Sequence, residues 1–164
     1  MKSLMWFRND LRMDDNPALR NACIESEEVH AIYIYSSKQN HFHHEANCKI
    51  EFVIENLKNL DKELSKINIP LTIIDSKGFD DNPNIIINLI KERSLKKVFW
   101  NKQFGVDEQN RDELVSTSFN KNNIEYSSYN EKVVYSPGSI RTGENKPYSV
   151  FTPFKKKWIE NFNL

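Results

Sequence analysis

The run Leu4-Met5-Trp6-Phe7, followed after a polar stretch by Asn16-Pro17-Ala18-Leu19, decides the fold. Four apolar residues with charge behind them are typical of a buried strand. Asn16 suits the capping position of a helix and Pro17 its first turn, so a helix should follow the strand. The stretch from Val29 to Tyr35 is rich in β-branched and aromatic residues and predicts a second strand. The chain therefore starts as a strand, a helix and another strand.

The rest of the first 130 residues continues this alternation. A polar loop is expected from Ser36 to Glu45, and apolar residues at steps of three and four predict a long amphipathic helix from Cys48 to Ile67. Further strands are expected at 71–74, 97–100 and 124–129, with helices around 85–90 and over 107–119. This pattern predicts an α/β, Rossmann-like, doubly wound five-stranded parallel sheet, with strand order 3-2-1-4-5 and helices on both faces.

The alternation stops after residue 130, so we assign 1–130 to the α/β domain and 131–164 to a different kind of segment. Ser136-Pro137-Gly138 and the stretch 142–147 are rich in turn residues. A last helix is expected at about 152–162, and it carries many aromatic residues for a chain end. We expect this segment to pack against something further.

Composition excludes several classes of protein. Lys and Arg together number 23, as do Asp and Glu, so no global charge favours nucleic acid or an anionic membrane. The apolar run at the N-terminus is too short for a signal peptide, and no stretch has the length of a membrane span. The two cysteines, Cys23 and Cys48, form no C-x-x-C motif, which favours reduced thiols. We expect a cytoplasmic protein without a membrane segment.

A doubly wound sheet places its ligand crevice outside the carboxyl ends of the strands where strand order reverses, here between the first and fourth strands. Its expected walls are the segments 8–15 and 101–107, with 36–44 adjoining. The candidate lining residues are Arg8, Asp10, Arg12, His43, Gln103, Asp107 and Glu108. The four glycines form neither a G-x-G-x-x-G motif nor a Walker loop. A flat heterocycle with many hydrogen-bonding edges fits this set better than a nucleotide triphosphate.

Structural explanations compete for several of these residues. Asp10 and Arg12 suit an ion-pair network at a strand end better than a ligand site, and both explanations stay open for Arg8. Asp107 and Glu108 fall at a predicted helix start, where acidic residues are favoured in any case. The histidines at 41, 43 and 44 with Cys48 match no ordinary zinc spacing, so no metal is assigned.

Three segments resemble the cryptochrome/photolyase family of light-dependent proteins. Residues 6–19, WFRNDLRMDDNPAL, are similar to the opening pattern W-F-R-x-D-L-R-x-x-D-N-x-A-L of that family. Residues 100–112, WNKQFGVDEQNRD, resemble the loop after the fourth strand, and residues 148–158, YSVFTPFKKKW, resemble the closing signature Y-x-V-F-T-P-F-x-x-x-W. The three occur in the family's order and spread over the whole chain.

The resemblance implies the antenna-binding α/β domain of a DNA photolyase. In that family the domain holds a light-harvesting chromophore, and FAD in a helical second domain donates an electron to a cyclobutane pyrimidine dimer flipped out of damaged DNA. The loop after the fourth strand resembles the methenyltetrahydrofolate-binding kind more than the deazaflavin or FMN kinds. By this resemblance Glu108 would bind the pterin ring and His43 would be a further contact, while Asp107 stands where relatives often have Asn.

The resemblance also sets expectations about activity. The full-length enzyme would be a deoxyribodipyrimidine photo-lyase, whereas the chain itself would be a fragment without repair activity that ends in the linker to a missing helical FAD domain. A cryptochrome photoreceptor is the alternative within the family. A nucleotide-binding module of similar topology is the alternative outside it, although no glycine-rich phosphate loop is present.

Overall fold

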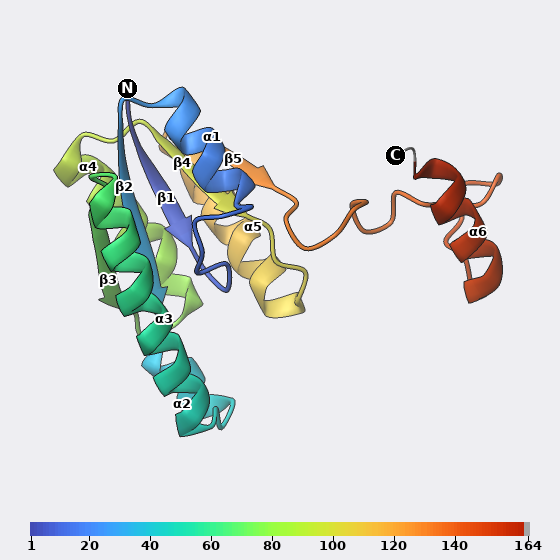
Figure 1. Ribbon diagram of the computed structural model, residues 1–164, viewed down its shortest axis with the longest axis horizontal. Helices are drawn as coiled ribbons and strands as arrows, with labels where there is room; N and C mark the ends of the chain where they lie inside the picture. The colour runs from blue at the N-terminus through green and yellow to red at the C-terminus, as the bar shows by residue number, and fades with distance from the viewer. Residues whose placement is uncertain (163–164) are drawn as a thin grey trace. The chain divides into compact units, whose positions relative to one another are not determined.

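The computed structural model describes residues 1–162, and its first unit, Met1–Tyr129, is built on a parallel sheet (Figure 1). The strands are β1 (Lys2–Phe7), β2 (Glu28–Tyr35), β3 (Leu71–Asp75), β4 (Lys97–Asn101) and β5 (Glu125–Tyr129). Their order is β3-β2-β1-β4-β5, and each neighbouring pair is parallel. The predicted fold class and strand order are confirmed.

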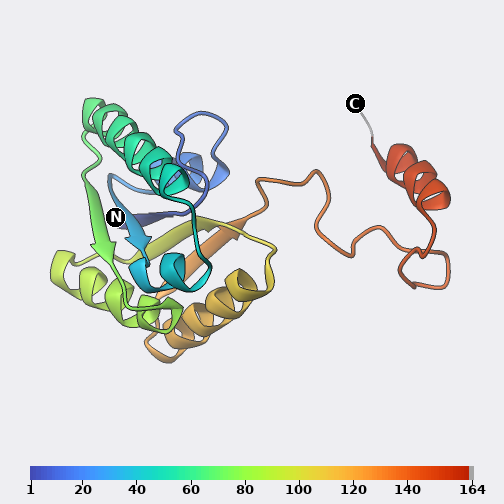
Figure 2. The same ribbon diagram turned by 90° about the horizontal axis from the view of Figure 1, so that it is seen from below.

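Helices cover both faces of this sheet, as Figure 2 shows. They are α1 (Pro17–Glu25), α3 (Asn47–Lys66), α4 (Asn82–Arg93) and α5 (Val106–Lys121). Side chains alternate along β1, so Leu4 and Trp6 enter the core with α4 and α5, while Met5 and Phe7 enter the core with α1 and α3. Because both faces are buried, this central strand is apolar at every position from Leu4 to Phe7.

Three buried polar side chains tie the loop after β1 to α1 and β4. The side chain of Asn16 caps α1, where its oxygen accepts a hydrogen bond from the Leu19 backbone N–H at 3.1 Å. Asn101, the last residue of β4, donates through Nδ2 to Asp10 Oδ2 at 2.6 Å and to Asn16 Oδ1 at 2.7 Å. The predicted cap is confirmed, and Asn16 also joins two elements that are distant in the sequence.

The segment between β2 and α3 differs from the expectation of a loop. Residues Ser37–Phe42 form a short helix, α2, and residues Phe79–Asp81 form a 3-10 turn, η1, that was also not predicted. The backbone N–H of Ser37 donates to Asp75 Oδ1 at 3.1 Å, so a side chain from the end of β3 supports the start of α2. A six-residue polar helix held by a distant side chain leaves no periodic signal in its own sequence.

The second unit starts at Asn130, and its described residues, 130–162, contain one helix, α6 (Phe151–Asn161). An aromatic cluster holds it together: the ring centroids of Tyr135 and Trp158 lie 5.5 Å apart edge to face, and Trp158 stacks on Phe162 at 5.1 Å. Phe151 at the start of α6 is exposed. Within residues 1–162, no helix is both long enough and apolar enough to cross a membrane.

We expect Asn16→Ala to destabilise the protein by about 2 kcal/mol, because it removes the cap of α1 and leaves the buried amide of Asn101 with one acceptor fewer. Thermal or urea unfolding of the purified chain measures this loss. Asn120→Ala, at an exposed position of α5, is the matched control. Equal stability of the two variants would show that the buried cluster does not support the fold.

Candidate functional site

A cleft of about 220 Å³ opens at the carboxyl ends of β1 and β2, on the side that α5 borders. This is the edge of the sheet at which loops on either side of a strand-order reversal diverge. Residues from five regions of the first unit line it: Trp6, Arg8, Asn9, Tyr33, Ile34, Tyr35, Ser36, His43, Glu45, Lys49, Ile50, Val53, Phe79, Asn82, Gln103, Asp107, Glu108 and Arg111.

Five of the seven candidate lining residues line this one cleft: Arg8, His43, Gln103, Asp107 and Glu108. Arg8 follows β1, His43 follows α2, and Gln103 lies in the loop after β4. Asp107 and Glu108 lie in the first turn of α5, and His43 Nε2 approaches Asp107 Oδ2 at 4.0 Å. The structure thus brings the five together, while their roles in binding stay predictions.

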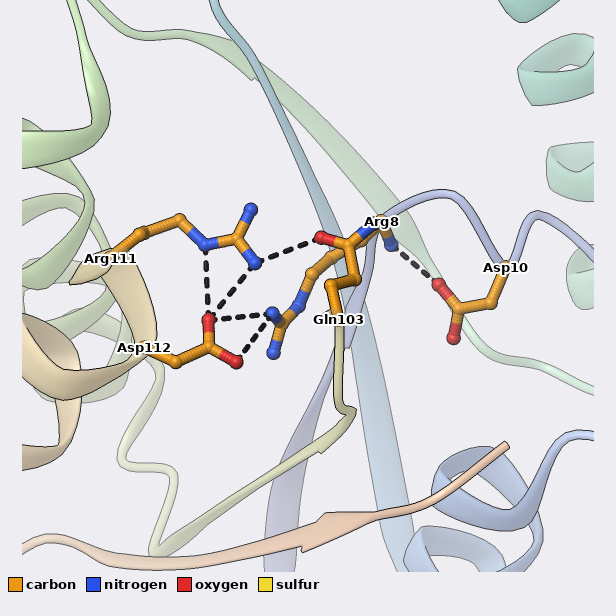
Figure 3. Close-up of polar contacts among 5 residues, drawn as sticks. All are labelled: Arg8, Asp10, Gln103, Arg111 and Asp112. Atoms are coloured by element: carbon orange, nitrogen blue, oxygen red, sulfur yellow. Dashed lines mark hydrogen bonds and ion pairs between the residues drawn. The ribbon is translucent and has the colours of Figure 1, made fainter. Parts of the chain in front are cut away.

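The inner wall of the cleft is organised around one carboxylate, Asp112 of α5 (Figure 3). Its Oδ1 accepts a hydrogen bond from Arg8 Nη1 at 2.7 Å and from Arg111 Nη2 at 2.9 Å. The same Arg111 nitrogen donates to Gln103 Oε1 at 2.9 Å. Two guanidinium groups and an amide from three segments are therefore fixed by charge-assisted hydrogen bonds.

The guanidinium of Arg8 is almost fully buried and lies 4.3 Å from the centroid of the Trp6 ring. Burial, and after it the nearby charge of Arg111, lowers the pKa of Arg8 to about 10, while Asp112 acts in the opposite direction. Arg8 is still a cation at neutral pH. Its Nε and Nη2 are buried with no hydrogen-bond partner among the described residues. Arg8 thus supplies positive charge to the wall of the cleft, although these two nitrogens are buried.

The rim of the cleft is acidic and more open. Glu108 is half-buried, and no ion pair or hydrogen bond joins its carboxylate to another described residue. This carboxylate folds back over Gly105, the residue before α5, so that a methyl group at position 105 would lie 2.0 Å from Glu108 Oε2. The absence of a side chain at Gly105 lets the Glu108 carboxylate occupy this position at the cleft.

Two of the expected lining residues lie elsewhere. Asp10 is buried, and its carboxylate accepts hydrogen bonds from the Arg8 backbone N–H at 2.7 Å and from Asn101. Arg12 donates through Nη2 to the Asp15 carbonyl oxygen at 2.8 Å. Asp10 thus supports the loop after β1, and neither side chain lines the cleft. Within residues 1–162, no group of three His, Cys, Asp or Glu side chains could hold a metal ion.

Sequence reasoning missed several lining residues, among them Trp6, Phe79 and Arg111. Trp6 was assigned only to a strand, and Phe79 belongs to a turn that was not expected. Arg111 could have been found, because it lies one helical turn after Glu108 and therefore on the same face of α5.

The sequence matches the DNA photolyase family model over residues 3–163. This chain belongs to the DNA photolyase family. It is 35% identical over 159 residues to the deoxyribodipyrimidine photo-lyase of Vibrio cholerae. These aligned residues make up 97% of this chain and 34% of that protein. It is 26% identical to cryptochrome-2 of Arabidopsis thaliana, over 97% of this chain and 25% of the relative. The chain thus spans about a third or less of the relatives it matches.

Solved structures share the fold. An archaeal photolyase from Sulfolobus tokodaii superposes with a TM-score of 0.74 at 23% identity, over 96% of this chain and 34% of that one. That photolyase structure contains two FAD molecules, with the implication of a novel light-harvesting cofactor. The family uses a flavin together with a second, antenna chromophore.

Replacing Asp112 by Asn should lower the free energy of unfolding by about 2 kcal/mol or more, because two adjacent guanidinium groups would lose their shared counter-ion in a largely buried position. Chemical denaturation measures the change. Glu113→Gln alters the exposed neighbouring carboxylate and serves as control. If both variants unfold alike, the ion pairs of Asp112 contribute nothing net to stability.

Proposed function

We propose that this chain is the antenna-binding domain of a deoxyribodipyrimidine photo-lyase and that its cleft binds methenyltetrahydrofolate. One observation carries the proposal: five of the seven candidate residues line a single cleft, at whose rim Glu108 has a carboxylate without a partner among the described residues. Residues 1–130 would form the antenna domain, and 131–164 would lead towards a helical domain that holds FAD.

The carboxylate of Glu108 favours a pterin over a flavin. The 2-amino-4-oxo edge of a pterin presents two adjacent N–H donors, which a carboxylate can accept together. The corresponding edge of FMN or of a deazaflavin presents one N–H between two carbonyl oxygens, and these oxygens repel a carboxylate. Asp107 adds a second acceptor beside Glu108, and His43 lies close to Asp107 at the rim.

The walls of the cleft also suit a flat ring. Tyr33 and Phe79 offer aromatic surface, and Ile50 and Val53 of α3 offer aliphatic surface. Most of the other lining residues are polar or charged, so the cleft offers hydrogen-bonding partners to the edges of a ring that these side chains contact. When bound, methenyltetrahydrofolate would supply the absorption of light, and the chain's own residues would hold it in a fixed orientation.

The complete protein would use the excitation collected here to drive FAD-dependent repair of cyclobutane pyrimidine dimers in damaged DNA. The higher identity to photolyases, 35% against 26% for the plant cryptochrome, supports repair over signalling. Repair of a dimer-containing oligonucleotide by the full-length protein would separate these two activities.

Glu108→Ala should weaken binding of methenyltetrahydrofolate about 10- to 100-fold, because it removes charge-assisted hydrogen bonds to the ring. Equilibrium dialysis with detection of the near-ultraviolet folate band gives the dissociation constant. Glu113→Ala removes an acidic side chain of the same helix that does not line the cleft. Unchanged affinity in Glu108→Ala would remove Glu108 from the site, and absence of folate binding by the unmodified chain would contradict the proposal.

Gly105→Ala should weaken folate binding in the same direction as Glu108→Ala while leaving thermal stability nearly unchanged. The backbone at Gly105 has φ −66°, which alanine adopts without strain, but its methyl group would displace the flexible Glu108 carboxylate. In the double variant Gly105→Ala/Glu108→Ala the two effects should not add. Additive losses would show that Gly105 acts by some other route.

A further inference from the structure

Arg111 has a geometry that the function proposed above leaves unused. It lies on α5, lines the cleft and is only 5% exposed. Its guanidinium carbon lies 5.2 Å from the centroid of the Trp6 ring and 4.9 Å from that of the Phe79 ring. Hydrogen bonds from Nε and Nη2 to Asp112, and from Nη2 to Gln103, fix its plane.

One nitrogen of this fixed group remains available. No described residue accepts a hydrogen bond from Arg111 Nη1, and in Figure 3 this nitrogen points away from the bonded network. The buried side-chain atoms without a partner include two nitrogens of Arg8 but not Nη1 of Arg111, so Nη1 retains access to solvent. A rigid, charged donor therefore borders the cleft in which the ligand would bind.

The spacing of Arg111 and Glu108 on α5 defines what the pair can recognise. Residues three apart on a helix lie on one face, with Cβ atoms about 5–6 Å apart. Glu108 accepts hydrogen bonds only, and Arg111 donates only. The pair therefore fits a ring edge on which donors stand next to an acceptor. The 2-amino-4-oxo edge of a pterin has this order: the 2-amino group, N3–H and then the carbonyl oxygen O4.

We propose that Arg111 is a specificity-determining residue that donates through Nη1 to the O4 carbonyl oxygen of the bound pterin, and so selects 4-oxo over 4-amino pteridines. This inference rests on the proposed folate site. A 4-amino group would place its N–H donors against the guanidinium, which has no acceptor to offer. Asp112 and Gln103 act as positioning residues, because they fix the plane of the guanidinium.

A purely structural Arg111 makes a different prediction. If Arg111 only completed the ion pairs of Asp112, its replacement would change stability and weaken all ligands alike. A specificity-determining Arg111 instead changes the ratio of affinities between two ligands that differ in the group at position 4 and in the proton on N3. Glu108 contributes to this ratio through N3 in both the unmodified protein and the variant, so a change of the ratio on replacing Arg111 reports on position 4. This ratio is insensitive to a uniform loss of folded protein, because both ligands are measured on the same sample.

The experiment is a competition assay in which folic acid and its 4-amino analogue aminopterin displace methenyltetrahydrofolate from the 164-residue chain. The unmodified protein should prefer folic acid by about tenfold or more. Arg111→Met, which keeps an unbranched side chain but has no donor, should reduce this preference about threefold or more, to the part that Glu108 supplies by accepting from the N3–H that the 4-amino ring lacks. Arg20→Met, at an exposed position of α1, should keep it.

Each outcome decides between the hypotheses. If folic acid does not compete better than aminopterin with the unmodified chain, the role of Arg111 is wrong whether or not the variant folds. If Arg111→Met is folded by circular dichroism and keeps the full preference, the role is also wrong, while a folate site dependent on Glu108 survives. If methenyltetrahydrofolate itself does not bind, both proposals fail together.

Discussion

The hydrogen bond from Asn101 to Asp10 joins the two strand ends at which the order of the sheet reverses. Asn101 ends β4, and Asp10 lies in the loop that follows β1. The chain leaves β1 towards α1 on one face of the sheet and leaves β4 towards α5 on the other, so the two loops diverge. β1 and β4 pair from Ser3 to Met5, and the hydrogen bond from Asn101 to Asp10 extends this connection past the last paired residues to the loops that carry Arg8 and Gln103.

The position of the loop after β1 also explains why charged side chains are buried near the cleft. Arg8 is two residues from Asp10 and lies in the wall of the cleft, where its guanidinium is almost fully removed from water. Asp112 supplies the counter-charge, and Trp6 supplies the face of a ring. Arg111 also pairs with Asp112, so two positive guanidinium groups share one negative carboxylate. The charge of Asp112 does not balance both, and an electron-rich edge of a ligand is therefore favoured at the inner wall.

The fold could be predicted from the sequence because its signals are local. Apolar strands, the cap at Asn16 and the periodicity of α3 each show within a short window. The helix α2 could not be predicted in this way, because Asp75, about 40 residues further along the chain, supports its first turn. The same reason applies to the site: motifs placed Glu108 and His43 near a crevice, whereas the contributions of Trp6 and Phe79 depend on packing between elements.

Helix α5 shows how one element can serve structure and recognition together. Its first turn carries Glu108, and Gly105 leaves room for the carboxylate of that residue. One turn later Arg111 faces the same cleft, while the adjacent Asp112 reaches Arg8. The acidic first turn is stabilised by the helix dipole in any case, so a carboxylate at the rim costs the fold little. A helix that starts at the point of strand reversal can therefore carry recognition groups at three-residue spacing without weakening its own start.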